Sequence, residues 1–250
     1  MNHSPLRRLS VLLLCAACWL PAKALAIRPF VTDDARVVGA RLAQLETWVR
    51  YDVQSLEHNI LAAFGPTDWL ELSGGLVHGA VIEGDGAGYT IKGPLLQGKV
   101  LAMPAVDNGH PGLAFAGGAL FPWGRGEFRE PGWGAFAYAA ATQSLEAEAI
   151  LIHVNLGVTT GDDLEEVNVT AGIGSQIKVL GGMHGVFEIF YGDPYAPGFA
   201  LWATQVGFRY IFNASIQCDG TFGSTFTEVE GGETEQWGTL GLRIVSPELW

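Results

Sequence analysis

The stretch that decides the fold reads Gln44-Leu45-Glu46-Thr47-Trp48-Val49-Arg50-Tyr51. Its even positions carry Gln, Glu, Trp and Arg, whereas its odd positions carry Leu, Thr, Val and Tyr. Because side chains alternate between the two faces of an extended chain, this period of two predicts a β-strand with one polar and one apolar face. No segment after residue 26 shows a comparably long helical period.

The same alternation recurs along the chain between turn-forming residues. In 148–158, for example, Ile152 and Val154 alternate with His153 and Asn155. Together with 44–51 the predicted strands number about twelve, and the others are 56–64, 69–78, 91–102, 113–121, 133–142, 148–158, 167–177, 186–191, 202–210, 216–223 and 237–245.

The composition leaves two all-β architectures. Hydrophobic residues make up 48% and charged residues 16%, yet no apolar run after residue 26 approaches the roughly 20 residues of a membrane helix. A soluble β-sandwich is one option, and a transmembrane barrel with an apolar outside and a polar inside is the other. The even number of long strands favours an antiparallel transmembrane β-barrel, because a sandwich has turns every 8–12 residues or so.

Residues 1–26 predict a cleaved secretory signal peptide. Arg7 and Arg8 form a positive region, an apolar run follows, and Ala24-Leu25-Ala26 is a cleavage site of small residues. A lipoprotein signal ending at Cys18 is the alternative, but the residues before that cysteine make a poor lipobox.

Removal of the signal peptide makes an acidic chain more acidic. The formal net charge changes from −12 to −15, because the leader holds three basic residues and no acidic one. Such a charge excludes nucleic acid as a partner. Only Cys218 remains after cleavage, so no internal disulfide can form.

The connections between the predicted strands alternate in length. With the N-terminus in the periplasm and residues 27–40 as an N-terminal periplasmic segment, the outward connections are mostly long and the inward ones include short turns such as 65–68. Short periplasmic turns and longer outer loops are typical of outer-membrane barrels, so residues 27–250 are predicted to form one.

Polar residues on one face of the predicted strands are expected to line the lumen. The candidates are Gln44, Glu46, Arg50, Glu71, Lys99, His153, Asn155, Glu188, Gln205, Arg209, Asp219 and Arg243. They could form a paired salt-bridge network that fills a narrow barrel, since buried charges must be paired. They could instead form the selectivity surface of an open pore.

The outward connections predict an acidic outer mouth. They hold 14 acidic residues and only two basic ones, Arg125 and Arg129. Such a field concentrates cations. The alternative is that these acids only keep the loops solvated, or bind divalent ions that bridge lipopolysaccharide. The candidates singled out are Asp162, Asp163, Glu228, Glu230, Glu233 and Glu235.

Catalysis, metal binding and cofactors are not indicated. His153 and Asn155 suggest an outer-membrane lipase, but no serine stands near them at a motif spacing. The other mature histidines are scattered, with none at a chelating spacing along the chain. We therefore expect no enzyme, no cofactor and no metal. Trp48 and Trp237 fall on the lumen side, where they either plug the lumen or contact a ligand.

The stretch Pro29-Phe30-Val31-Thr32-Asp33-Asp34-Ala35, at the start of the mature chain, resembles the outer-membrane proteins of the phenol-degradation meta-pathway family. The segments 65–72 and 154–157 and the closing Gly241-Leu242-Arg243 resemble it more weakly. The resemblance implies a barrel linked to uptake of small, sometimes aromatic, compounds, and it supplies no catalytic residues.

The expected function is a channel or transporter for small molecules in the outer membrane of a Gram-negative bacterium. A closed barrel with a structural or surface-interaction role is the first alternative, and a soluble exported β-sandwich binding protein is the second. The expected partners are outer-membrane lipid, lipopolysaccharide, the barrel-assembly machinery and a solute that the sequence does not name.

Overall fold

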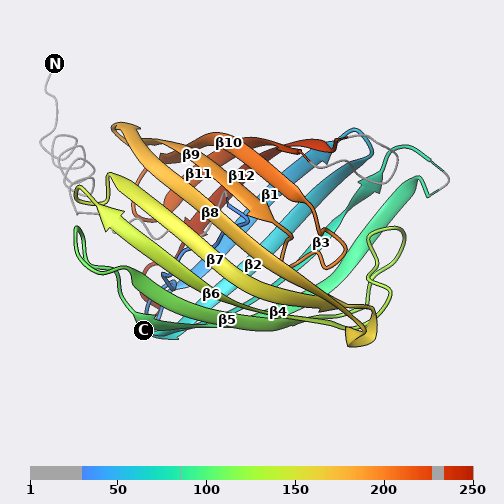
Figure 1. Ribbon diagram of the computed structural model, residues 1–250, viewed down its shortest axis with the longest axis horizontal. Helices are drawn as coiled ribbons and strands as arrows, with labels where there is room; N and C mark the ends of the chain where they lie inside the picture. Colours follow the sequence, from blue (N-terminus) through green and yellow to red (C-terminus); the bar gives the residue numbers. More distant parts are fainter. Residues whose placement is uncertain (1–29, 85, 227–233, 250) are drawn as a thin grey trace, which may run out of the picture.

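A computed structural model of the chain describes residues 30–84, 86–226 and 234–249. The predicted signal peptide lies outside these residues. Twelve strands form a closed barrel in which each strand pairs with the next and β12 pairs with β1, all antiparallel (Figure 1). The strands are β1 (Ala43–Asp52), β2 (Ser55–Thr67), β3 (Leu70–Val81), β4 (Gly88–Met103), β5 (Gly112–Leu120), β6 (Gly134–Leu145), β7 (Ile150–Gly161), β8 (Glu166–Leu180), β9 (Met183–Tyr191), β10 (Trp202–Ile211), β11 (Ile216–Thr225) and β12 (Gln236–Val245). The prediction of an antiparallel barrel of about twelve strands is confirmed.

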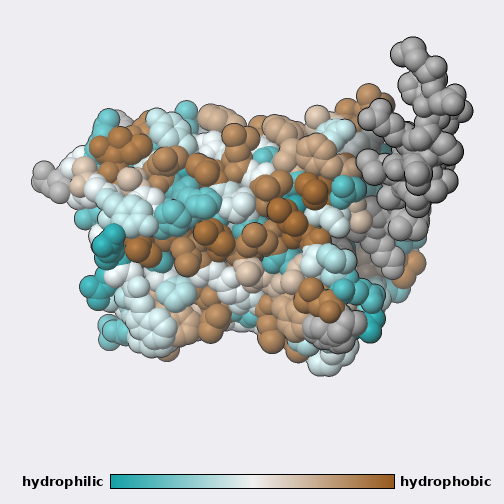
Figure 2. All heavy atoms as spheres, turned by 180° about the vertical axis from the view of Figure 1, so that it is seen from behind, coloured by the Kyte–Doolittle hydropathy of each residue, from teal (hydrophilic) through white to brown (hydrophobic). Residues whose placement is uncertain are grey.

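The alternation in the sequence becomes an outside and an inside. Leu45, Val154 and Leu240 point outward and are 43%, 45% and 68% exposed, while their neighbours in the strands point into the barrel. Apolar side chains accordingly cover much of the outer surface (Figure 2). Closure of β1 on β12 pairs the backbone groups that an open sheet edge would leave unsatisfied, which a lipid environment requires.

Most strands run further than the sequence pattern indicates. β4 begins three residues before its predicted start, and the register between β3 and β4 shifts at Gly75 and Val77. Pro94 lies in this irregular stretch of β4, where its missing N–H removes no regular ladder bond. No helix among the described residues is long and apolar enough to cross a membrane.

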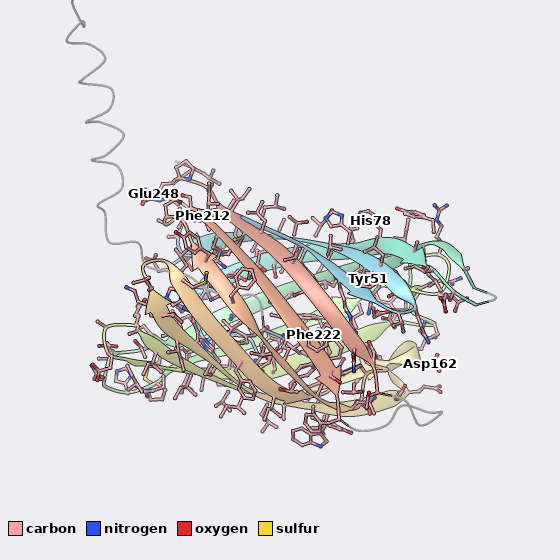
Figure 3. The ribbon with its side chains drawn as sticks, turned by 90° about the horizontal axis from the view of Figure 1, so that it is seen from above. Tyr51, His78, Asp162, Phe212, Phe222 and Glu248 are labelled. Carbon is pink, nitrogen blue, oxygen red and sulfur yellow. The ribbon has the colours of Figure 1, made fainter. Side chains whose placement is uncertain are left out.

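The two ends of the barrel differ in their connections. One end carries 53–54, 82–87, 121–133, 162–165, 192–201 and 226–235. The other carries 68–69, 104–111, 146–149, 181–182 and 212–215, of which 104–111 is the longest. Figure 3 shows Phe212 and Glu248 at this second end and Asp162 at the first. Glu248 pairs with Arg41 at 2.9 Å, so the residues before β1 and after β12 meet there.

The segment before β1 corrects the sequence analysis. Residues 27–40 are expected in the periplasm, but the described part from residue 30 to residue 38 runs inside the barrel. Thr32, Ala35 and Val38 are 2%, 1% and 0% exposed. We call residues 30–38 the plug segment. A period-two pattern detects strands only, so it gives no sign of a chain that folds back among the polar side chains of the lumen.

Candidate functional site

The lumen wall contains the residues that the sequence assigns to it. All but one are buried, and the exception, Arg50, has a side chain that is 25% exposed. They lie on β1, β3, β4, β7, β9, β10, β11 and β12, and all occupy the inward face of their strands. The buried members are Gln44, Glu46, Glu71, Lys99, His153, Asn155, Glu188, Gln205, Arg209, Asp219 and Arg243.

A buried ion pair ties the plug segment to the wall. Lys99 Nζ lies 2.6 Å from Asp33 Oδ2 and 3.9 Å from Asp34 Oδ1. Tyr138 donates its hydroxyl to the same Asp33 oxygen at 2.7 Å, and Asp34 also pairs with Arg36 at 2.8 Å. The Lys99 side chain is fully buried, so its charge depends on these two carboxylates for compensation.

Carboxylates of the wall accept the backbone N–H groups of the plug segment. Glu188 receives Val31 N–H at 2.8 Å and Thr32 N–H at 2.9 Å, while Glu71 receives Val38 N–H at 2.8 Å. These donors have no strand partner, and a buried N–H left unpaired is costly. The wall therefore supplies acceptors at the places where the plug segment presents donors.

His153 is one of the wall residues that hold the plug segment in place. Its Nδ1 lies 3.0 Å from the Thr142 hydroxyl oxygen, which in turn accepts Ala35 N–H at 2.8 Å. The ring centroids of His153 and Phe30 lie 5.4 Å apart. His153 is 0% exposed, so this contact is fully inside the barrel.

Glycines of β8 make the room that the plug segment occupies. A Cβ atom on Gly172 would stand 2.2 Å from Thr32 Oγ1, and one on Gly174 would stand 3.2 Å from the Phe30 ring. Real Cβ contacts are never as short as the first, so a side chain at Gly172 conflicts with the seated segment. Nothing in the local sequence of β8 gives this role to its glycines.

A second polar network holds the wall itself. Arg243 Nε donates to Gln44 Oε1 at 2.7 Å, and Gln44 Nε2 donates to Glu46 Oε1 at 2.9 Å. Arg209 donates to Gln176 elsewhere on the wall. These contacts resemble the paired network weighed from the sequence.

A cavity of about 230 Å³ remains on the side of the plug segment that faces the long connections. Phe30 and Val31 form part of its lining, as do the aromatic side chains Trp48, Trp237 and Tyr195. Arg50, Glu57, Asn59, Lys92 and Gln205 are the principal polar residues around it. We call this cavity the chamber. Trp48 and Trp237, the two tryptophans that the sequence places on the lumen side, both line it.

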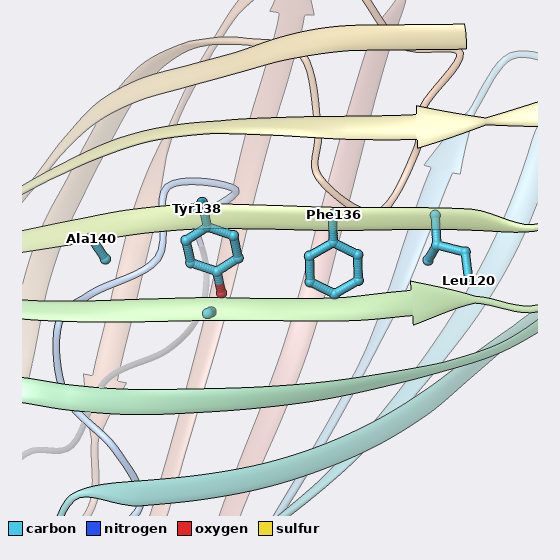
Figure 4. Packing of buried hydrophobic residues seen from close by; sticks show 5 residues of the cluster. Leu120, Phe136, Tyr138 and Ala140 are labelled. Atoms are coloured by element: carbon cyan, nitrogen blue, oxygen red, sulfur yellow. The ribbon is translucent and has the colours of Figure 1, made fainter. Parts of the chain in front are cut away.

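A loop from the long-connection end reaches the chamber. Tyr195, from the connection between β9 and β10, donates its hydroxyl to Gln97 Oε1 at 2.9 Å and lies 3.2 Å from the Tyr138 hydroxyl. Tyr138 packs in a row of inward side chains with Phe136 and Ala140 (Figure 4). Because Tyr138 also donates to Asp33, one hydroxyl links the loop to the plug segment.

The predicted mouth acids divide into three groups. Glu228, Glu230 and Glu233 lie outside the described residues. Asp162 and Asp163 are exposed at the end with the long connections, although Asp163 also accepts Trp133 N–H at 2.9 Å. Glu235 forms a close ion pair with Arg50, whose guanidinium carbon lies 4.7 Å from the Trp237 ring centroid. This last acid therefore belongs to the rim of the chamber.

No group of three or more metal-ligating side chains occurs within the described residues.

Comparison with known proteins finds similarity of fold. No family model matches the chain, and no curated protein does. Among solved structures, an outer membrane channel from Pseudomonas putida F1 superposes with a TM-score of 0.69 at 14% identity, covering 88% of this chain and 100% of that one. The fold is that of an outer-membrane β-barrel. The KdgM porin (TM-score 0.57, 8% identity, 80% and 98% covered) and the NanC porin (0.55, 10%, 81% and 98%) are similar in the same sense.

Proposed function

We propose that this chain is an outer-membrane channel for small molecules whose solutes have an apolar or aromatic body. The observation that carries this proposal is the chamber, in which Trp48, Trp237 and Tyr195 line a concave space next to a few polar side chains. Small-molecule sites are typically concave and largely apolar, with a small number of polar groups that orient the ligand. A barrel with a purely structural role needs no such space.

The size of the chamber limits the solute. Its volume of about 230 Å³ is below the roughly 300–1,000 Å³ that is usual for drug-sized ligands. Single-ring compounds suit it better than oligosaccharides do. Arg50 and Lys92 are both engaged in ion pairs, with Glu235 and Glu130 respectively, so they orient polar substituents without adding an uncompensated positive charge.

Passage through the barrel requires the plug segment to move. Phe30 and Val31 form part of the chamber lining, and the segment occupies the lumen from there to Glu71 near the end of β3 that meets the short turns. The same observation favours a second candidate, a barrel that stays closed and serves a structural role. The channel and the closed barrel differ in whether the plug segment leaves the lumen.

Ion current across planar bilayers tests both candidates. We expect the mature protein to conduct, and a variant lacking residues 27–38 to conduct more. Benzamide should block the current at lower concentration than acetamide, which presents the same amide without the ring. Trp237→Ala should weaken the benzamide block and leave acetamide unchanged.

The outcomes separate the candidates. A shortened variant that folds but does not conduct would establish the closed barrel. Equal block by benzamide and acetamide would remove the aromatic solute from the proposal. In a salt gradient we also expect cation preference from the acidic mouth, which should fade as the Debye length falls from about 10 Å at 0.1 M salt to about 3 Å at 1 M.

A further inference from the structure

A row of polar side chains lies on the outside of the barrel. Thr47, His58 and His78 occupy outward positions of β1, β2 and β3, since His58 stands opposite both the exposed Val49 and His78. Polar groups on this face are unexpected because it otherwise presents aliphatic residues to the bilayer. Figure 3 shows His78 toward the same end of the barrel as Asp162.

The side chains of this row contact one another. His58 Nε2 lies 2.6 Å from the Thr47 hydroxyl oxygen, and His58 Nδ1 lies 2.9 Å from His78 Nε2. The Tyr89 ring continues the row on β4, with its centroid 6.0 Å from that of His78. Among the described residues, His78 Nδ1 has no hydrogen-bond partner. The row therefore ends on an imidazole nitrogen and a tyrosine that is 53% exposed.

Arg125 adds a fixed positive charge beside Tyr89. Its backbone N–H and C=O exchange two hydrogen bonds of 2.8 Å with Ile91, and its carbonyl also accepts the Thr90 hydroxyl at 2.8 Å. The guanidinium carbon lies 4.9 Å from the Tyr89 ring centroid. Within the described part of the chain this guanidinium has no ion pair or hydrogen bond. A cation held over an aromatic ring, with its donors unused, is suited to an external anion.

The row lies near one end of the strands, at the level expected for lipid headgroups. Tyr89 is the second residue of β4, and His78 stands three residues before the end of β3. Tyr51, in the same strand as Thr47, is 56% exposed near the end of β1. Exposed tyrosines mark the membrane–water interface of barrels, where headgroup phosphates lie.

We infer that His78, Tyr89 and Arg125 form a binding site for a phosphate group of a glycolipid in the outer leaflet. The guanidinium, the free imidazole nitrogen and the phenol can each donate a hydrogen bond to phosphate oxygens, while the neighbouring aliphatic side chains contact the acyl chains. Charge complementarity selects this occupant, because Arg125 is one of only two basic residues in the connections at this otherwise acidic end. The inference rests on the outer-membrane location in the proposed function, but it is independent of the solute.

Native mass spectrometry of the mature protein with lipid A tests the site. The probes are lipid A carrying its phosphates and the same lipid after enzymatic dephosphorylation. We expect the phosphorylated form to be retained, and Arg125→Gln and His78→Gln each to lower its retention about tenfold or more, as for the loss of a charge-assisted hydrogen bond. Arg129→Gln is the matched control, because Arg129 is an exposed arginine in the same connection.

The inference would be overturned by equal retention of both lipids, by wild-type retention in Arg125→Gln, or by an equal loss in Arg129→Gln, which would indicate net charge alone. Displacement of lipid A by millimolar inorganic phosphate would show that the site selects free phosphate, and would also overturn it. Arg125 lies in a connection, so its variant tests the site even if His78→Gln fails to fold. Benzamide block measured on the same variants keeps failure of this site distinct from failure of the channel.

Discussion

Replacement of Asp33 by asparagine should release the plug segment from the lumen while the barrel stays folded. Asp33 Oδ2 accepts from both Lys99 Nζ, at 2.6 Å, and Tyr138 OH, at 2.7 Å. An asparagine either loses the negative charge on that oxygen or places an amide donor against two donors. The strands keep their complete hydrogen-bond ladder, so the effect falls on the seating of the segment.

The magnitude follows from the neighbours of Lys99. Breaking a buried ion pair by removing one partner costs about 3–5 kcal/mol. Lys99 keeps Asp34 at 3.9 Å and stands opposite Glu71 in the β3–β4 register, so part of its compensation survives. We therefore take the lower end, about 3 kcal/mol, which corresponds to about a hundredfold rise in the population of the unseated segment.

Cysteine accessibility measures that population. Ala35 is 1% exposed, so Ala35→Cys in a Cys218→Ser background should react slowly with a water-soluble maleimide. Asp33→Asn should accelerate the labelling about a hundredfold, by the estimate above. Asp52→Asn is the matched control, because Asp52 is a buried carboxylate that accepts the N–H groups of Gln54 and Ser55 at the turn between β1 and β2. Unchanged labelling in Asp33→Asn, or equal acceleration in Asp52→Asn, would refute the reasoning.

Three further predictions concern other parts of the molecule. Gly172→Ala should accelerate the same maleimide labelling, because its Cβ would stand 2.2 Å from Thr32 Oγ1; addition of Thr32→Ala should restore slow labelling, and no rescue would indicate a different cause. Leu240→Arg, on the lipid face, should cost about 2–4 kcal/mol near the bilayer midplane in a refolding titration, whereas Thr239→Arg can extend into the chamber and should cost less; equal costs would reverse the assigned faces. Hydrogen bonds from Ala147 N–H and the Ser144 hydroxyl hold the pKa of Asp107 below its usual range, so the stability this carboxylate gives to its turn is complete above the ordinary pKa of about 4 and is lost as the pH falls through the lowered value. A ¹³C NMR titration should show that low midpoint, and Ser144→Ala should raise it; an unchanged midpoint would contradict the assignment.

The strands and their inward faces could be predicted because both depend on a local pattern. A residue such as Lys99 or Glu188 needs only its neighbours in sequence to reveal which side of a strand it occupies. The ends of the strands could be predicted less well, because β4 and β8 continue into segments whose alternation is interrupted by glycine, proline or charged residues. There the pairing with neighbouring strands, and not the local pattern, decides where the strand stops.

The plug segment could not be predicted because its partners are distant in sequence. Val31 N–H meets Glu188 across 157 residues, and Ala35 N–H meets Thr142 across 107. The sequence of the opening, with Asp33 and Asp34, favours an ordinary turn, and the Asp34 carboxylate does accept Arg36 N–H at 2.8 Å in a turn of that kind. Burial of the turn inside the barrel depends on wall residues far away in the sequence, such as Lys99, which pairs with Asp33.

The nature of these contacts argues for a segment that can leave its seat. Glu71 and Glu188 accept backbone N–H groups of the plug segment, and both would face the aqueous lumen if the segment withdrew. Exchange of a protein hydrogen bond for one to water changes the free energy by only about 0.5–1.5 kcal/mol. Withdrawal also returns conformational entropy to the segment, at roughly 1–2 kcal/mol for each residue released. The buried Lys99–Asp33 pair differs from these hydrogen bonds, because two charges separated inside the barrel lose their ion pair before water can hydrate them. A single substitution at this pair is therefore expected to decide between the closed and the open barrel.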